Sequence, residues 1–376
     1  MKYKKNILLL GVILTVAFTS SKYSYALDNI IRPYQSVRSA GMGGVRLTTG
    51  IYQENFFNNP ARVTANEEWR IQLPDPMIET SSATITSASD IISSTSGSGA
   101  NELITQIADK AGTNLHGRFQ MTFPAVYIPF ERFSFAAALI TSAQFDIDLR
   151  RSYQIDPMVY TDIGPAVTIG RKFLDNKALS LGATAHITYR LSSTSIFTLS
   201  DLIQGLSLSP TQTGSDGAHF DLDFGATYKL PWRPFDASVV TALTINNFLG
   251  GKYENLGLSA LKNDSTPRAQ PRTIGLGISI TKHVFWKFYD ATLAFEITDI
   301  GNNTNGSLFR LLHLGGKLKF LFLEPRVGLN QGYFSAGVGM SLKLFDIDFA
   351  TYGEEMTLNA GGLQDRRWAL RVSFEI

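Results

Sequence analysis

The chain ends with ten residues, Arg367-Trp368-Ala369-Leu370-Arg371-Val372-Ser373-Phe374-Glu375-Ile376, that alternate between apolar and polar side chains. Successive side chains of a β-strand point to opposite faces. One face therefore carries Trp368, Leu370, Val372, Phe374 and Ile376, and the other carries Arg367, Arg371, Ser373 and Glu375. About 9–11 residues are enough for a tilted strand to cross a bilayer. The pattern predicts a strand with lipid outside and a polar lumen inside.

The same alternation recurs along the chain, for example over Leu181–Arg190, Asp221–Lys229 and Tyr289–Ile297. A soluble sandwich could contain one such strand, but many in succession that end in aromatic residues are typical of a membrane barrel with aromatic girdles. We predict an all-β, membrane-spanning antiparallel β-barrel of about fourteen strands over residues 69–376. The predicted strands are Trp69–Asp75, Gly117–Phe130, Arg132–Arg151, Pro157–Phe173, Lys177–Thr198, Gly217–Leu230, Phe235–Phe248, Gln270–His283, Phe288–Ile300, Ser307–Leu323, Glu324–Gln331, Tyr333–Leu344, Asp346–Gly353 and Arg366–Ile376.

Short and long connections alternate between these strands, as they do between the periplasmic and external ends of bacterial barrels. The short links lie near Glu131, Asp175-Asn176, Pro231–Pro234, Val284–Lys287 and Phe345, and the long ones are Thr80–His116, Leu199–Asp216, Leu249–Ala269 and Glu354–Asp365. Within the first long loop, the spacing of apolar residues predicts a short helix over Asn101–Gly112 that packs on the loop. We expect the short links to face the periplasm.

The chain begins with the features of a secretory signal peptide. Three lysines among the first five residues precede the apolar run Ile7–Phe18, and Ser24-Tyr25-Ala26 provides a small-residue cleavage site. The run is shorter than the roughly 20 residues that a membrane helix needs. We predict a signal peptide over residues 1–26, a mature chain that starts at Leu27, and a location in the cell outer membrane.

The composition excludes several classes of function. The formal charge of only +2 and the near-zero mean hydropathy fit neither a disordered chain nor a nucleic-acid binder. The chain has no cysteine, so it contains no disulfide framework and no thiolate metal site. The expected partners are outer-membrane lipid and the barrel-assembly machinery, which would read the last strand. Because Ile376 replaces a terminal aromatic residue, we expect Phe374 to carry part of that signal.

Residues 27–68 do not alternate and are too long for a simple tail. They contain Gly41-Met42-Gly43-Gly44 and, further on, Asn59-Pro60-Ala61. Clustered glycines permit tight turns, and a proline restricts the residue before it. We predict a compact hatch, or plug, inside the barrel, with Asn59 hydrogen-bonded to the lumen walls. A phosphate cradle is not expected, because no strand precedes the glycines and no helical pattern follows them.

With these motifs in this order, the chain resembles the FadL-like outer-membrane transport proteins and their PorV-like relatives. The Gly41–Gly44 run, the Asn59-Pro60-Ala61 motif, and the tail with Tyr352–Glu355 and Asp365–Trp368 carry the resemblance. It implies a fourteen-stranded barrel closed by an N-terminal hatch. It also implies passage of a hydrophobic small-molecule ligand, such as a long-chain fatty acid, through a pocket above the hatch and out through the barrel wall. The PorV-like branch implies an alternative role in protein secretion or surface assembly, with envelope secretion partners.

Charged side chains fall on the predicted lumen face, at Arg190, Asp290, Glu296, Lys317, Lys319, Asp346, Asp348 and Arg371. Buried charges need partners, so we favour ion pairs that fill the lumen over a pathway for charged solutes. The Asp-X-Asp pairs Asp146/Asp148 and Asp346/Asp348 could bind calcium, but ion pairing explains them as well. We predict no metal and no cofactor.

A hydrolase at the rim of the lumen is the second alternative. His219, Asp221 and Asp223 share one face of a strand, where a histidine and a carboxylate could form an acid–base pair. No serine occupies a nucleophile-elbow setting, so we assign these residues a structural role. We predict no catalytic residues and no enzyme activity.

The register of the last strand can be tested by placing an arginine on each face. Val372→Arg would point into lipid and should destabilise the barrel by about 2–4 kcal/mol, whereas Ser373→Arg should have a mild effect. The free energy of unfolding in urea, measured in lipid vesicles, reports both values. Equal losses at the two positions would show that the register is wrong.

Overall fold

The computed structural model describes residues 31–87, 109–150, 154–194, 196–198, 214–255, 265–285, 289–303, 306–342, 344–357 and 359–374. The predicted signal peptide, most of the predicted helix Asn101–Gly112, and the terminal Ile376 lie outside the described residues.

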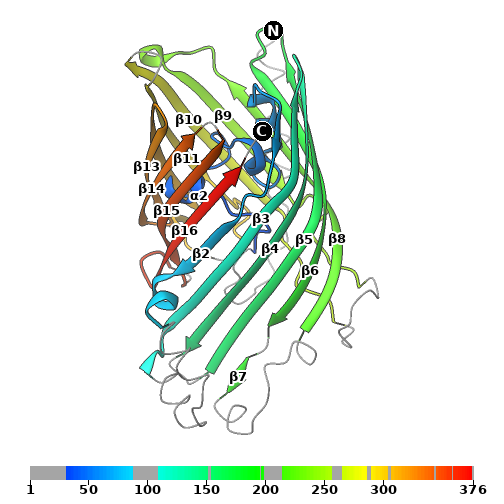
Figure 1. The fold of residues 1–376 in the computed structure, drawn as a ribbon, viewed down its shortest axis with the longest axis vertical. Coiled ribbons are helices and arrows are strands. Elements are labelled where there is room, and N and C mark those ends of the chain that lie inside the picture. Colours follow the sequence, from blue (N-terminus) through cyan, green and yellow to red (C-terminus); the bar gives the residue numbers. More distant parts are fainter. Residues whose placement is uncertain are drawn as a thin grey trace.

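A closed antiparallel β-barrel of fourteen strands surrounds the N-terminal part of the chain (Figure 1). The strands are β1 (Arg70–Gln72), β2 (Met77–Ser81), β3 (Thr113–Pro129), β4 (Phe133–Arg150), β5 (Gln154–Phe173), β6 (Leu179–Thr194), β7 (Phe197–Thr198), β8 (Gly214–Lys229), β9 (Ser238–Asn246), β10 (Thr273–Phe285), β11 (Tyr289–Ile297), β12 (Leu312–Phe320), β13 (Leu323–Asn330), β14 (Tyr333–Leu342), β15 (Phe345–Glu355) and β16 (Gln364–Phe374). β1 and β2 both pair with β3 and form one interrupted strand, while β7 continues β6 along β5. β16 pairs with β2 and closes the ring. The predicted fold class is confirmed.

The first barrel strand differs most from its prediction. The sequence predicts one strand over Trp69–Asp75, but the chain pairs in two pieces, β1 and β2, on either side of Pro74-Asp75-Pro76. A proline has no N–H to donate to a sheet ladder, which explains the interruption. The sequence predicts a loop over Thr80–His116, but the end of β2 and the start of β3 extend into the two ends of this range.

Two other strands start later than predicted. β9 starts at Ser238 because the turn η3 (Pro234–Asp236) precedes it, and β12 starts at Leu312 after the turn η4 (Leu308–Leu311). The remaining boundaries agree within a few residues.

The two faces of the barrel wall differ in polarity. In β16, Trp368, Leu370 and Phe374 are exposed on the outside, while Arg367 and Ser373 are buried inside. Other exposed outward residues include Ile187, Leu293, Val327 and Phe334. An apolar belt of this extent is expected of a surface that contacts lipid. Among the described residues, no helix is long and apolar enough to cross a membrane.

The wall is much taller on one side than on the other. β3 to β6 and β8 contain 16–20 residues, whereas β9 and β11 to β16 contain 8–11. At about 3.3 Å per residue, these are lengths of roughly 50–65 Å and roughly 25–35 Å. β8 and β9 pair up to the short turn that joins them, so the extra length of β8 lies at the opposite end. The long strands therefore extend beyond a hydrocarbon core that is about 30 Å thick.

Residues 31–68, here called the N-terminal segment, lie against the inner face of this wall. The segment contains α2 (Val37–Gly41), η1 (Tyr52–Asn55) and η2 (Pro60–Ala65). α2 contacts β13 to β16, and η2 contacts β4, β5, β6 and β8. Because these strands lie on different arcs of the ring, the segment crosses the lumen (Figure 1, blue).

Glycines of the wall make room for this segment. A Cβ atom at Gly182 would lie 2.5 Å from the backbone nitrogen of Ala61, and one at Gly328 would lie 2.5 Å from the carbonyl carbon of Met42. Such approaches are possible only without a side chain. The described wall glycines at which a Cβ would come within 3.0 Å of the segment are here called the glycine cradle: Gly170, Gly182, Gly225, Gly275, Gly315, Gly328 and Gly337.

Adjacent glycines of β12 provide a matched test of the glycine cradle. Gly315 faces the segment, whereas a Cβ at its neighbour Gly316 would meet the end of the Leu293 side chain at 3.0 Å and the Thr292 carbonyl at an ordinary contact distance of 3.6 Å. Gly315→Ala should displace the segment, and Gly316→Ala should not. Hydrogen–deuterium exchange of residues 31–68 should rise at least severalfold in the first variant alone. Unchanged exchange in a folded Gly315→Ala barrel would contradict the close contact.

Candidate functional site

The Gly41-Met42-Gly43-Gly44 motif forms the turn that follows α2. Gly43 and Gly44 have φ angles of +69° and +86°, a region that side chains other than glycine disfavour. The turn lies close to the wall, where a Cβ on Gly41 would come 3.0 Å from the Cα of Gly337. The Gly43 carbonyl lies 2.9 Å from Nδ1 of His313 on β12. The motif therefore places the chain against β12 to β14.

The Asn59-Pro60-Ala61 motif contacts another arc of the wall. Ala61 lies beside Gly182 and Gly225, while Asn59 Nδ2 donates to the carbonyl of Leu47 (2.7 Å) and Asn59 Oδ1 accepts from the Ala61 N–H (3.0 Å). The expectation that Asn59 hydrogen-bonds to the lumen wall is wrong: both partners belong to the segment. Its side chain connects Leu47 to Ala61 within the segment, and Asn59, Pro60 and Ala61 pack against the wall glycines Gly182 and Gly225.

A carboxylate of the wall binds the middle of the segment. Glu296 of β11 accepts hydrogen bonds from the backbone N–H groups of Arg46 (2.7 Å), Leu47 (2.8 Å) and Thr48 (3.1 Å). The sequence predicts an ion pair at Glu296, but its hydrogen-bond donors are these three backbone amides and the Thr48 hydroxyl (3.2 Å). Charge-assisted hydrogen bonds of this kind are stronger than neutral ones. Glu296 is therefore the main polar contact that holds this part of the segment to the barrel.

A buried ion pair stabilises the segment internally. Arg38 Nη2 lies 2.5 Å from Glu54 Oε2, and both side chains are almost fully buried. Glu54 also accepts from the Ile51 N–H (3.0 Å) and from the Ser36 hydroxyl. Burial raises the pKa of Glu54, but the Arg38 charge and these hydrogen bonds more than offset it, so the pKa is lowered. The pair stays charged, and the segment retains a defined shape.

Many of the other lumen charges pair with one another, as predicted. Arg190 bonds Asp162 at 2.6 and 2.7 Å. Glu324 joins Lys317 to Arg326, and Asp348 joins Arg326 to Arg371. Asp346 lies 3.9 Å from Arg70.

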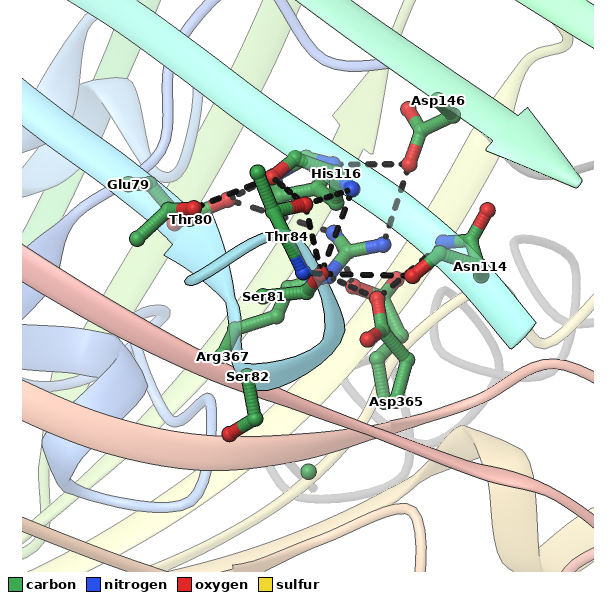
Figure 2. A network of polar contacts seen from close by, with 12 residues as sticks. Glu79, Thr80, Ser81, Ser82, Thr84, Asn114, His116, Asp146, Asp365 and Arg367 are labelled. Carbon is green, nitrogen blue, oxygen red and sulfur yellow. Dashed lines mark hydrogen bonds and ion pairs between the residues drawn. The ribbon is translucent and has the colours of Figure 1, made fainter. Parts of the chain in front are cut away.

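A second polar network joins the ends of the barrel sheet (Figure 2). His116 of β3 contacts Glu79 of β2 through Nε2 (2.8 Å) and Asp146 of β4 through Nδ1 (2.7 Å). Arg367 of β16 contacts the same Asp146 at 3.2 Å and Asp365 at 2.8 Å. Because each ring nitrogen faces a carboxylate, both must donate, and His116 is held as an imidazolium. Asp146 is thus an ion-pair partner, and its neighbour Asp148 lies 3.6 Å from Arg150.

The residues considered for a hydrolase hold a loop in place. Asp221 accepts from the backbone N–H groups of Leu249 (2.8 Å) and Gly251 (2.7 Å), and Asp223 accepts from that of Asn247 (2.7 Å). The ring nitrogens of His219 have no hydrogen-bond partner among the described residues. In Figure 2, the Ser81 hydroxyl accepts from the backbone N–H of His116 instead of contacting its ring. Neither arrangement activates a nucleophile.

Within the described part of the chain, no group of three or more histidine or carboxylate side chains could hold a metal ion. A cavity of about 40 Å³ lies between the segment and β8 to β11. Arg32, Arg46 and Asn58 line it from the segment, and Asp223 and Asn246 line it from the wall. That volume holds a few water molecules, since one water needs roughly 10–15 Å³ by this measure. Pockets for drug-sized ligands measure about 300–1,000 Å³, so this cavity is too small for a ligand of that size.

The hydrogen bonding of the barrel wall is interrupted near Asp75. Between β1 and β2 the ladder to β3 is missing, and the ladder between β3 and β4 shifts between Thr122 and Ala125. The Asp75 carboxylate accepts from the Thr122 N–H in the gap. A side chain therefore replaces the missing backbone hydrogen bonds at this point.

Comparisons with known proteins give a structural likeness only. No protein-family model and no curated protein matches the sequence. The fold is similar to the toluene transporter TbuX of Ralstonia pickettii (TM-score 0.53, 12% identity, 91% of this chain and 97% of that chain). It is also similar to the toluene transporter TodX of Pseudomonas putida (0.52, 11%, 91% and 98%) and to the monoaromatic hydrocarbon channel CymD (0.52, 13%, 90% and 95%).

The contribution of Glu296 can be measured with a variant that keeps its shape. Glu296→Gln removes the charge and places a side-chain N–H donor opposite backbone N–H donors. The free energy of local opening at residues 46–48 should therefore fall by roughly 1–3 kcal/mol. Native-state hydrogen exchange at these amides measures that change. Glu67→Gln, in an exposed position of the same segment, serves as the control. Equal exchange in the two variants would contradict the anchoring role.

The likeness covers nearly the full length of each chain at low identity, and it therefore concerns the fold. The resemblance that the sequence motifs indicate is confirmed at this level: the chain has the fold of these hydrocarbon-transporting β-barrels.

Proposed function

We propose that this chain is an outer-membrane barrel for the passage of hydrophobic small molecules, with residues 27–68 as its hatch. The observation that carries the proposal is a closed barrel whose lumen is crossed by a segment of the same chain. The segment is held to the wall by hydrogen bonds and close packing, without any covalent link between them. Such contacts can break and re-form. The likeness in fold to hydrocarbon transporters and channels also supports the proposed passage of hydrophobic molecules.

Passage would require the hatch to move, because the segment crosses the lumen and the cavity beside it at β8 to β11 is too small for a cargo molecule. The wall side of the contact includes the glycine cradle and the Glu296 carboxylate. Gln120, Asn246 and His313 add hydrogen bonds to the segment, which keeps its own Arg38–Glu54 pair. The segment could thus shift as a unit. The interruption at Asp75 would offer an exit through the wall, where one side-chain acceptor replaces a ladder.

The substrate class under this proposal is apolar and of moderate size. The fatty-acid-like cargo rests on the motif resemblance, whereas the similar structures are described as transporters or channels of toluene and monoaromatic hydrocarbons. Both classes share apolar bodies that would partition into the lipid around the barrel. Mass spectrometry of small molecules retained after mild detergent purification would distinguish aliphatic acids from aromatic compounds.

The segment and the ion pairs inside the lumen favour a second candidate function. A barrel that serves as a secretion or surface-assembly accessory has no need of an open path, and buried ion pairs such as Arg190–Asp162 and Arg326–Asp348 would rigidify it. Co-purification with other envelope subunits, together with unchanged uptake in a deletion strain, would favour this candidate over transport.

Single-channel conductance in planar bilayers tests the hatch. Wild type should be nearly silent. Asn59→Ala removes the bonds to Leu47 and Ala61, and deletion of Gly41–Gly44 removes the turn at β12 to β14; both variants should conduct small ions while the barrel stays folded. Glu68→Gln, exposed at the end of the segment, should behave like wild type.

Two outcomes would count against gated passage. One is steady conductance by wild type. The other is silence of both hatch variants when their slower migration after boiling shows that the barrels are intact. In either case the accessory role would become the better explanation.

A further inference from the structure

Three basic residues gather at one corner of the rim that carries the short turns. Arg132 lies in the turn between β3 and β4, and Arg171 and Lys172 lie at the end of β5. The Lys172 N–H donates to the Arg132 carbonyl (2.6 Å), and Arg171 is the register partner of Phe133 in the ladder between β4 and β5. The three cations are therefore neighbours in space.

Positive charge is in excess at this corner, here called the basic corner and defined as residues 130–133 and 171–177. These two stretches contain four cations and two acids. Glu131 contacts Lys177 Nζ at 3.2 Å, and Asp175 is exposed in the turn between β5 and β6. None of the three cations described above has an ion pair among the residues that the structure describes.

The exposed acids Glu67 and Glu68 lie on another side of the barrel wall. They precede β1, which pairs with β3 on the edge opposite to β4. β3 and β4 therefore stand between these acids and Arg171.

Arg171 is exposed on the outer face of the wall, within the apolar belt. Ile169, two residues earlier on the same face of β5, is also exposed. The register partners of Arg171 are Phe133 of β4 and Leu181 of β6, and both are exposed apolar residues. A lipid-facing cation is costly near the bilayer midplane and tolerated near the interface. The position of Arg171 beside the turns therefore marks the level of the lipid headgroups.

Aromatic rings at the same corner are arranged as expected for that level. Phe130 and Phe133 are exposed and stack with ring centroids 4.2 Å apart. The Arg171 guanidinium lies 5.3 Å from the centroid of the Phe173 ring. Aromatic side chains are enriched where a membrane protein meets the headgroups, so the phosphate of a neighbouring lipid would be within reach of the basic corner.

We propose that the basic corner binds the headgroup of an anionic phospholipid through Arg132, Arg171 and Lys172, with the acyl chains against the outer faces of β4 to β6. Basic residues at a membrane surface attract anionic lipids, and guanidinium groups bind phosphate with paired hydrogen bonds. A soluble anion would satisfy the charges alone, whereas a lipid also covers the apolar residues on both sides of Arg171. The site depends only on the barrel lying in a membrane, so it holds whether or not cargo crosses the lumen.

Lys282 of β10 provides a matched comparison. It is exposed at the same end of the barrel and follows the outward residues Ile278 and Ile280 at a spacing of two. Its register partner is Ala291, and the adjacent His283 contacts Asp290. Lys282 is therefore an outward cation of the same wall that lacks the basic neighbours of Arg171.

Native mass spectrometry of the full chain, released from a nonionic detergent, tests the site by titration with phosphatidylglycerol and with phosphatidylcholine of the same acyl chains. Wild type should bind one phosphatidylglycerol on the order of tenfold more tightly than phosphatidylcholine. Arg132→Gln, Arg171→Gln and Lys172→Gln should each weaken phosphatidylglycerol binding by about fivefold and leave phosphatidylcholine binding unchanged. Lys282→Gln should bind both lipids like wild type.

Three results would overturn the proposal. The first is equal affinity of wild type for the two lipids, and the second is phosphatidylglycerol binding by the folded corner variants that matches Lys282→Gln. The third is displacement of phosphatidylglycerol by inorganic phosphate at millimolar concentration, which would indicate a site for a soluble anion. Gel migration before and after boiling shows whether each variant is folded, and if one corner variant is not, the other two decide the outcome.

Discussion

The arrangement of the interior depends on one contact. The Glu296 carboxylate accepts hydrogen bonds from three backbone N–H groups of the N-terminal segment. In lipid, a barrel wall can satisfy its own backbone, but an irregular segment inside it cannot form a ladder with that wall. Residues 46–48 run across the lumen with amides that point outward from the segment, and Glu296 supplies acceptors for them. The glycine cradle then allows the chain on either side of this contact to approach the sheet. Without the carboxylate, these amides would be buried without a hydrogen-bond partner. The segment would then lose the hydrogen bonds that offset the cost of packing closely on the sheet.

The sequence was sufficient to predict the barrel, because alternation determines which face of each strand meets lipid. Trp368 and Leu370 on one side and Arg367 on the other follow directly from a period of two. The interrupted first strand was missed, although Pro74 and Pro76 carried the signal: each removes a donor from the ladder. The acceptors for the segment could not be predicted. Whether Glu296 meets a cation or a row of amides depends on how residues far apart in sequence are brought together, and a strand pattern contains no such information. The same holds for Asn59, whose bonds turned out to be local.

The His116 network has a different role, at the place where the sheet closes. β2 and β16 come from opposite ends of the barrel sequence and share only a short ladder. Glu79, His116, Asp146 and Arg367 connect β2, β3, β4 and β16 through alternating charges, as Figure 2 shows. Because a barrel is stable only when its last strand meets its first, these side chains reinforce the weakest step of closure. A cluster of histidine, carboxylate and hydroxyl groups at a rim thus need not be a catalytic site.

The unequal height of the wall also has a consequence for how the molecule meets its surroundings. β8 extends past the end of β9 at the rim opposite their connecting turn, and β3 to β6 share its greater length, so this rim of the barrel is uneven. On the tall side, a compound that leaves the surface of the bilayer meets a continuous sheet. On the low side, β9 and β11 end at Asn246 and Ile297, directly before Asn247 and Thr298, which line the cavity. Direction of approach, and not only chemical affinity, would then select which molecules reach the interior.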